Sequence, residues 1–327
     1  MTVYRTRRGL SIKDITRYAG VPWLSGMAGN IFFLDPVNGN DSNKGTRPDK
    51  AFKTMAVAYA ALTANQHDIL FYIANSSGLT LGSADSYVIT WAKNYTHLIG
   101  TCAPTNIAQR CRIFTTAGQD VTPMVTWSAT GCVLANIYMF HGLASSDSEV
   151  CFSLTGGRNY FYNVHFAGIG HATQGDDAGA ISLQLAGAEE NLFERCTIGV
   201  DTIARSAANT ELSFSSSAVR NTFKDCLFLS YADAVGHYFV NASGASSAVD
   251  RFNLFDNCKF LNTPNVGSVA SLTTAFKIHA SLSGSFLLNR CTGFGFDDWD
   301  ADNTGRLYID GAAPTANTSG IALTTTA

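Results

Sequence analysis

From residue 132 onward, one pattern of apolar and polar positions recurs at intervals of 27 to 33 residues. We call this eight-residue motif the phrase. The copies are Cys132–Met139, Asn159–Phe166, Asn191–Ile198, Asn221–Phe228, Asn253–Phe260 and Phe286–Gly293. Taking the sixth residue of each as a marker, they sit at positions 137, 164, 196, 226, 258 and 291. A repeat of this length means that each unit packs against its neighbours, which predicts a solenoid.

The spacing inside each phrase is that of β-strands. From Cys196 to Ile198 the step is two residues, which is the period of a strand, whereas from Phe193 to Cys196 it is three. One residue with positive φ at a corner would cause this slip and keep both side chains inward. The six corner residues are Asn136, Asn163, Arg195, Asp225, Asn257 and Arg290. Since Asn and Asp tolerate positive φ best among non-glycine residues, we expect the two arginine corners to be built differently or to carry strain.

A second alternating run lies about ten residues upstream of each phrase, for example Ala180–Leu185. Each unit therefore reads strand, turn, strand, corner, strand, loop, and equivalent residues of parallel neighbours lie ~4.8 Å apart. Helical spacing explains the same residues poorly. We predict an all-β parallel β-helix with a core stack of Phe161, Phe193, Phe223, Phe255, Cys196, Cys226, Cys258 and Cys291.

The first part of the chain lacks the phrase and predicts a cap. Residues 31–75 read as a strand, a turn-rich loop, a helix over 54–64 that begins at Thr54, and a strand over 68–73. The open end of a solenoid exposes apolar surface and strand edges, so we expect this helix to plug it. The β-helix is then expected over 76–310 and a C-terminal tail over 311–327.

Residues 1–30 are predicted to be a basic anchoring arm. Its charged residues are Arg5, Arg7, Arg8, Lys13 and Arg17 against Asp14, a net +4. Because the whole chain carries −3, the remainder carries −7. Such an arm suits an acidic protein surface or nucleic acid, and a solvated tail that happens to be basic is the alternative.

Two motifs resemble those of a known superfamily. The stretch Leu34–Asp41, followed by Gly45-Thr46 and Ala51–Thr54, resembles the N-terminal signature of right-handed parallel β-helix proteins of the pectate-lyase-like superfamily. The repeated phrase is similar to its rung pattern, and together the two cover residues 31–310. The superfamily includes polysaccharide lyases, glycoside hydrolases, bacterial surface proteins and bacteriophage spike and tail proteins, so the resemblance implies a fold more than an activity.

Candidate catalytic residues are few. Asp176 and Asp177, within Gly175–Gly179, faintly resemble the paired-Asp segment of polygalacturonase-type hydrolases. The other segments of that family are missing, and an exposed loop is the alternative. Glycan cleavage needs two carboxyl groups flanking the bond. The rings of Trp91, Trp127, Tyr138 and Tyr160 are candidates for stacking on sugars, with core packing as the alternative.

We expect no cofactor. Asp298, Asp300 and Asp302 alternate as in oxygen-ligand calcium loops, but no bidentate Glu follows, so they are weak candidates for a metal site. No Cys/His spacing resembles a zinc site. The eight cysteines are predicted to be free thiols, mostly buried as small apolar residues.

Composition and the N-terminal sequence indicate the expected location and type of protein. Hydrophobic residues make up 46% and charged residues 14% of the chain, without the ~20-residue apolar run of a membrane span. The N-terminus lacks a signal-peptide pattern. We therefore expect a structural protein of a tailed-bacteriophage virion, a spike, decoration or tail component located on the particle and made in the host cytoplasm.

The expected partners are other virion proteins bound through the arm, a host surface glycan and, by resemblance, two further copies in a homotrimer. Two alternative functions stay open. One is a virion-associated polysaccharide depolymerase of the tailspike type. The other is a secreted carbohydrate-active enzyme, against which the N-terminus argues.

Overall fold

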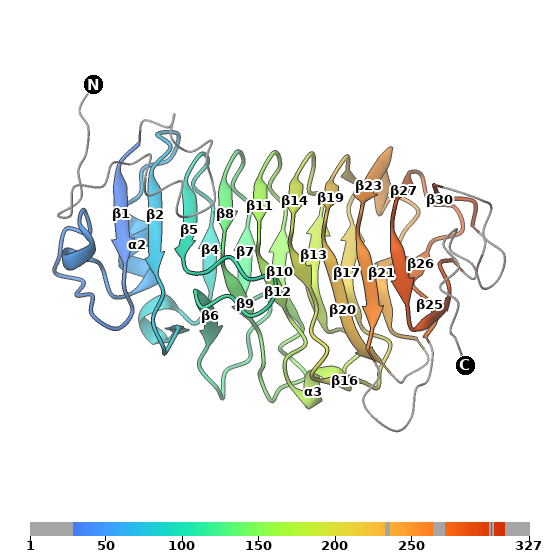
Figure 1. Ribbon diagram of the computed structural model, residues 1–327, viewed down its shortest axis with the longest axis horizontal. Coiled ribbons are helices and arrows are strands. Elements are labelled where there is room, and N and C mark those ends of the chain that lie inside the picture. The colour runs from blue at the N-terminus through green and yellow to red at the C-terminus, as the bar shows by residue number, and fades with distance from the viewer. Residues whose placement is uncertain (1–28, 233–235, 264–271, 301, 303, 311–327) are drawn as a thin grey trace.

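Parallel strands wind into one elongated coil (Figure 1). The computed structural model describes residues 29–232, 236–263, 272–300, 302 and 304–310, so most of the predicted arm and the predicted tail lie outside the described residues. All strand pairings in the described part are parallel, as in Phe161 with Phe193. The predicted parallel β-helix is confirmed.

Three sheets surround the core. Sheet A has ten strands: β1 (Ile31–Leu34), β2 (Ile69–Ile73), β5 (His97–Thr101), β8 (Val133–Ala135), β11 (Tyr160–Tyr162), β14 (Leu192–Glu194), β19 (Thr222–Lys224), β23 (Phe252–Asp256), β27 (Ser285–Asn289) and β30 (Leu307–Ile309). Sheet B has nine: β3 (Leu79–Leu81), β6 (Arg112–Thr115), β9 (Tyr138–Phe140), β12 (His165–Ala167), β15 (Thr197–Ile198), β20 (Leu227–Ala232), β24 (Lys259–Asn262), β28 (Thr292–Phe294) and, paired with β20, β16 (Ala204–Arg205). Sheet C has seven: β4 (Ile89–Trp91), β7 (Val125–Trp127), β10 (Val150–Leu154), β13 (Ile181–Ala186), β17 (Thr210–Ser215), β21 (Tyr238–Ala242) and β26 (Phe276–Ile278).

Smaller elements complete the coil. Two further strand pairs are β18 (Ala218–Val219) with β22 (Val249–Asp250), and β25 (Leu272–Thr274) with β29 (Phe296–Asp298). The helices are α2 (Met55–Ala61) and α3 (Ala172–Gly175), with single 3₁₀ turns η2 (Pro48–Lys50) and η3 (Ser83–Asp85). No helix in the described part is long and apolar enough to cross a membrane.

The core is a stack of equivalent side chains. The ring centroids of Phe161 and Phe193 lie 4.6 Å apart, those of Phe193 and Phe223 4.5 Å, and those of Phe223 and Phe255 4.9 Å. All four side chains are buried. Because parallel strands repeat at ~4.8 Å, identical rings stack face to face in each turn of the coil.

Columns of polar atoms accompany the ring stack. Cys196 donates its thiol proton to the carbonyl of Phe161, and each later cysteine of the column repeats this contact one turn on. Four of the six phrases begin with asparagine, and these residues form a column in which Asn191 Nδ2 donates to Asn221 Oδ1 and Asn221 Nδ2 to Asn253 Oδ1, each at 2.9 Å. These buried amides satisfy one another.

The corner between sheets A and B is a single residue with positive φ in all six copies, from 51° to 55°. Of the two alternatives expected for the arginine corners, a different construction is excluded and strain is the one that applies, because Arg195 and Arg290 have φ of 55° and 54°. Arg290 Nη2 forms an ion pair with Asp256 Oδ1 at 2.7 Å, because the coil places Asp256 beside it on the preceding turn. A left-handed non-glycine residue costs about 1–2 kcal/mol.

Replacing Arg195 with asparagine is expected to stabilise the fold by about 0.5–1 kcal/mol, because asparagine adopts positive φ at lower cost. The neighbouring corner Asn163 already donates its amide to Asn136, so a third amide extends that contact. Urea denaturation measures the change. Arg110→Asn, at an exposed residue without positive φ, is the control and should leave the stability unchanged, and a destabilised Arg195→Asn variant would contradict the explanation.

A short helix covers the N-terminal end, as predicted. Thr54 caps α2, its hydroxyl accepting a hydrogen bond from the Val57 amide. Met55 and Ala58 are buried in the core cluster beneath β1 and β2. These two strands are also the first members of sheet A, since Phe33 pairs with Phe71.

Candidate functional site

An open groove of about 480 Å³ lies on the outer face of sheet A over β11 and β14. It is lined by Arg158, Asn159, Tyr160, Glu190, Leu192 and Glu194. Strand alternation puts Tyr160, Leu192 and Glu194 outside, because the neighbouring Phe161 and Phe193 point into the core, whereas Asn159 is buried. The rings of Tyr160 and Tyr162 lie 5.9 Å apart and form an aromatic wall at the groove.

A carboxylate and a tyrosine hydroxyl meet at one end of the groove. Tyr160 donates its hydroxyl proton to Glu194 Oε2 at 2.7 Å, and Lys224 Nζ donates to Glu194 Oε1 at 3.0 Å. Burial, followed by the Glu194 contact, raises the pKa of Tyr160, so its hydroxyl stays protonated. The hydrogen bond to Glu194 also raises the pKa of Lys224. Both Glu194 oxygens are thus held in fixed positions.

The second carboxylate lies between two arginines at the other end. Glu190 Oε2 is 2.8 Å from Arg158 Nε, and Arg220 pairs with Glu190 Oε1. The Arg220 hydrogen bond lowers the pKa of Glu190, which favours the ionised form. Arg158 and Glu190 both have positive φ, so the turn before each strand of sheet A turns these long side chains toward one another.

This arrangement favours binding over acid catalysis. A glycoside hydrolase needs one carboxyl group with a raised pKa that donates a proton to the leaving oxygen. Here Glu190 and Glu194 are each paired with cationic side chains. Ionised carboxylates and a guanidinium accept and donate hydrogen bonds to hydroxyl groups, and the tyrosine rings offer an apolar face.

Sheet C carries a different surface, a row of polar side chains that crosses all seven strands. In register, the row is Thr90, Thr126, Ser153, Gln184, Ser213, Asn241 and Lys277. Ser153 Oγ donates to Gln184 Oε1 at 3.0 Å, so members of the row also bond one another. The row has hydrogen-bonding groups but no aromatic ring, which makes it the weaker candidate for sugar binding.

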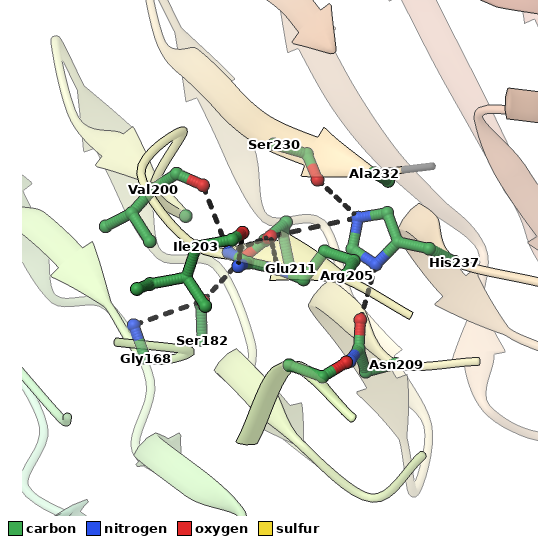
Figure 2. A network of polar contacts seen from close by, with 12 residues as sticks. Gly168, Ser182, Val200, Ile203, Arg205, Asn209, Glu211, Ser230, Ala232 and His237 are labelled. Carbon is green, nitrogen blue, oxygen red and sulfur yellow. Dashed lines mark hydrogen bonds and ion pairs between the residues drawn. The ribbon is translucent and has the colours of Figure 1, made fainter. Parts of the chain in front are cut away.

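A buried polar network lies between sheets B and C (Figure 2). Arg205 pairs with Glu211 at 2.9 Å, and neither side chain is exposed. Burial raises the pKa of the Glu211 carboxyl, and the guanidinium opposes this effect. Arg205 Nη2 also donates to the Val200 carbonyl, so the pair attaches the loop before β16 to β17.

The same network contains a serine, a histidine and an asparagine in a row. His237 lies 2.9 Å from Ser230 Oγ through Nε2 and 2.6 Å from Asn209 Oδ1 through Nδ1 (Figure 2). This order of groups resembles a catalytic triad. All three residues are buried, with exposures of 0–1%, so no substrate reaches the hydroxyl and the row has a structural role.

The structure places one of the sequence candidates, Tyr160, in the groove and the others away from it. Asp176 is exposed at the end of α3, and Asp177 accepts a hydrogen bond from the Gly179 amide, on the loop that precedes β13 of sheet C. Trp91 and Trp127 are core residues, stacked at 4.8 Å. Tyr160 lines the groove, whereas Tyr138 lies on the outer face of sheet B against His165.

The acidic stretch near the C-terminal end binds protein groups. Asp300 Oδ2 accepts from the Thr304 amide and hydroxyl, and Asp302 pairs with Lys277. Asp298 accepts from the Asp300 amide. Within the described residues, no three His, Cys, Asp or Glu side chains lie close enough to hold a metal ion. The arm residues Arg5, Arg7, Arg8, Lys13 and Arg17 lie outside the described part.

Of the groove residues, the sequence singled out Tyr160 but not the charged residues. Glu194 and Lys224 occupy the fourth position of successive phrases, and Asp256 follows in the next. The alternation of charge at this position was a signal in the sequence, because parallel stacking places these side chains side by side.

No protein-family model matches the sequence, and no curated protein matches it. Among solved structures, a rhamnogalacturonan lyase is similar at 16% identity with a TM-score of 0.54, over 86% of this chain and 72% of that chain. A pectin methylesterase from Aspergillus niger is similar at 12% identity with a TM-score of 0.45, over 90% and 95% of the two chains. The pectate lyase Pel9A is similar at 9% identity with a TM-score of 0.43, over 85% and 82%.

The similarity to the rhamnogalacturonan lyase supports the fold that the geometry shows. At this identity it concerns the fold alone. The predicted resemblance to pectate-lyase-like β-helices is therefore confirmed as a resemblance of fold, and the closer resemblance to bacteriophage virion proteins stays a prediction.

Proposed function

We propose that this protein is a glycan-binding β-helix and that a sugar chain lies in the groove over β11 and β14. The observation that carries the proposal is the combination of the Tyr160 ring with two carboxylates in fixed positions, Glu190 and Glu194, in one open groove. Binding sites for small molecules combine apolar surface with a few positioned polar groups. Sugar rings offer the matching apolar faces and hydroxyl groups.

The charge of the groove selects the class of glycan. Its lining contains one arginine and two glutamates, and the side chains paired with them add Arg220, Lys224 and Glu189, so these charges sum to zero. An acidic polysaccharide would place its carboxylates next to these glutamates, and like charges repel at short range. We therefore propose a neutral glycan as the ligand.

Two finer functions are proposed in second place. One is a depolymerase, which would use the same fold and the same groove but requires a proton-donating carboxyl group there. The virion setting, the attachment through the basic arm and the homotrimer rest on the sequence alone. In that setting the groove would serve to hold a host surface glycan.

Replacing Tyr160 with alanine is expected to weaken glycan binding about tenfold or more, since loss of a stacking ring costs roughly 1.4 kcal/mol. The ligand is first chosen by screening the full chain against immobilised neutral and acidic glycans, and affinities are then measured by calorimetry. Tyr160→Phe keeps the ring and is expected to retain most of the affinity. Gln184→Ala, in the polar row of sheet C, is the matched control.

Three outcomes would contradict the proposal. They are no binding to any neutral glycan, a preference for acidic glycans, or loss of binding in Gln184→Ala while Tyr160→Ala still binds. The same glycans are incubated with the protein and assayed for reducing ends and unsaturated sugars. Turnover would favour the depolymerase.

A further inference from the structure

One corner of the coil carries a long insertion. In the six phrases a single corner residue such as Asn136 turns the chain from sheet A to sheet B, but nine residues, 102–110, separate Thr101 of β5 from Cys111. We call residues 102–110 the strap. It crosses the outer face of sheet B, because the Ala108 amide donates to His165 Nδ1 at 3.1 Å and the Asn106 carbonyl accepts from Thr197 Oγ1 at 2.6 Å.

Cys102 begins the strap and Cys111 directly follows it, and both sulfur atoms lie near the contact between Gly100 and Asn136. A Cβ built on Gly100 would lie 2.8 Å from Cys111 Sγ and 2.2 Å from the Asn136 carbonyl oxygen. That oxygen accepts from Cys102 Sγ at 3.5 Å, while Cys111 Sγ donates to the Tyr72 carbonyl at 3.3 Å. Only glycine leaves room for this contact.

The two thiols differ in exposure and in acidity. Cys102 is half-buried, whereas Cys111 is buried. The neighbouring Cys111 side chain lowers the pKa of Cys102 to about 7, while burial raises the pKa of Cys111. An accessible thiolate beside a second thiol is the usual arrangement of redox-responsive cysteines.

We propose that Cys102 and Cys111 are a redox-responsive pair that closes into a disulfide across the base of the strap on contact with a low-molecular-weight disulfide such as glutathione disulfide. The Cys102 thiolate attacks one sulfur of glutathione disulfide, forming a mixed disulfide and releasing one glutathione thiolate. Cys111, losing its proton, then attacks the Cys102 sulfur and releases the second glutathione. The two protein thiols are oxidised, and one glutathione disulfide is reduced to two glutathione molecules.

The cysteines of the core column also lie next to one another, but none of them is accessible. Cys196, Cys226, Cys258 and Cys291 occupy equivalent positions of successive turns, and all are buried. Their side chains point in parallel, which opposes the torsion angle that a disulfide requires. Cys102 instead approaches Cys111 from the far end of a loop.

Peptide mapping tests the proposal. The full chain is incubated with glutathione disulfide at about pH 8, alkylated and cleaved with trypsin. Cleavage after Lys93, Arg110 and Arg112 leaves Cys102 in the peptide 94–110 and Cys111 in the dipeptide 111–112. We expect these two peptides to be recovered as one linked species, lighter by two hydrogen atoms than the reduced pair, with the other six cysteines alkylated only after denaturation.

Two variants separate this pair from other cysteines. Cys102→Ser is expected to abolish the linked species, and Cys151→Ala, at a buried cysteine elsewhere in the core, is expected to retain it. Circular dichroism verifies that both variants fold. A mixed glutathione disulfide at Cys102 that never resolves, a link to another cysteine, or two unmodified thiols would overturn the proposal.

Discussion

Replacing Arg205 with alanine is expected to cost about 3–5 kcal/mol of folding free energy. The guanidinium bonds Glu211 at 2.9 Å, and neither side chain is exposed to water. Without it, the Glu211 carboxylate is left buried beside Ser182 with no cation to offset its desolvation. Urea denaturation followed by circular dichroism measures the loss.

A double variant distinguishes the effect of the unpaired Glu211 charge from the effect of the lost side-chain volume. Arg205→Met combined with Glu211→Leu removes both charges and fills most of the same space. Replacing a buried ion pair with apolar residues is often neutral, so this variant is expected to recover most of the lost stability. A cost below about 1 kcal/mol for Arg205→Ala would show that water or rearranged groups replace the guanidinium.

Acid is expected to unfold the protein well above the range in which carboxylates titrate. Burial lowers the pKa of His97 to about 3 and those of His141 and His165 to about 4, from an ordinary value of 6.5. Between pH 6.5 and about 4 the unfolded chain therefore binds protons that the folded chain excludes. Stability is complete above pH 6.5 and is lost as the pH falls through this window.

The hydrogen bonds explain why these rings stay neutral. The Ala108 amide points at Nδ1 of His165, whose Nε2 lies 2.8 Å from the Gly199 carbonyl. The Val133 amide points at Nδ1 of His97 in the same way. If Nδ1 of either ring took up a proton, its new N–H bond would point at the backbone N–H group that now donates to it. Protonation must therefore break the existing hydrogen bond.

Unfolding free energies at pH 7.5 and pH 5 measure the effect. Each shifted histidine is expected to remove about 2 kcal/mol at pH 5. His165→Gln should make the loss smaller, whereas His279→Gln, at a half-exposed site, should leave it unchanged. Equal stability at the two pH values would show that the buried rings accept protons.

The fold could be predicted from the sequence because its determinants repeat. The step of three residues from Phe193 to Cys196 required a corner with positive φ, and Arg195 at that corner has a φ of 55°. Residue preference left two alternatives open at Arg195 and Arg290, a different corner or a strained one, because it ranks conformational costs, whereas the stacked neighbours decide the backbone. Once Asn163 and Asp225 fix the turns on either side, the residue between them follows.

The groove could not be predicted in the same way. Inward positions repeat their residue type in every unit, but outward positions such as Glu194 and Lys224 differ from turn to turn. Whether such residues form a binding site depends on which residue lies beside them in the next strand, and only the strand register supplies that information. The strap shows the same limit, since Cys102 and Cys111 are close because an insertion folds back on itself.

A crystal structure of the full chain soaked with the neutral oligosaccharide that binds best would test the central claim most directly. The account predicts ordered sugar on the outer face of sheet A, with a ring against Tyr160 and hydroxyl groups within hydrogen-bond distance of Glu190 or Glu194. Sugar ordered along the polar row of sheet C, with the groove empty, would contradict it.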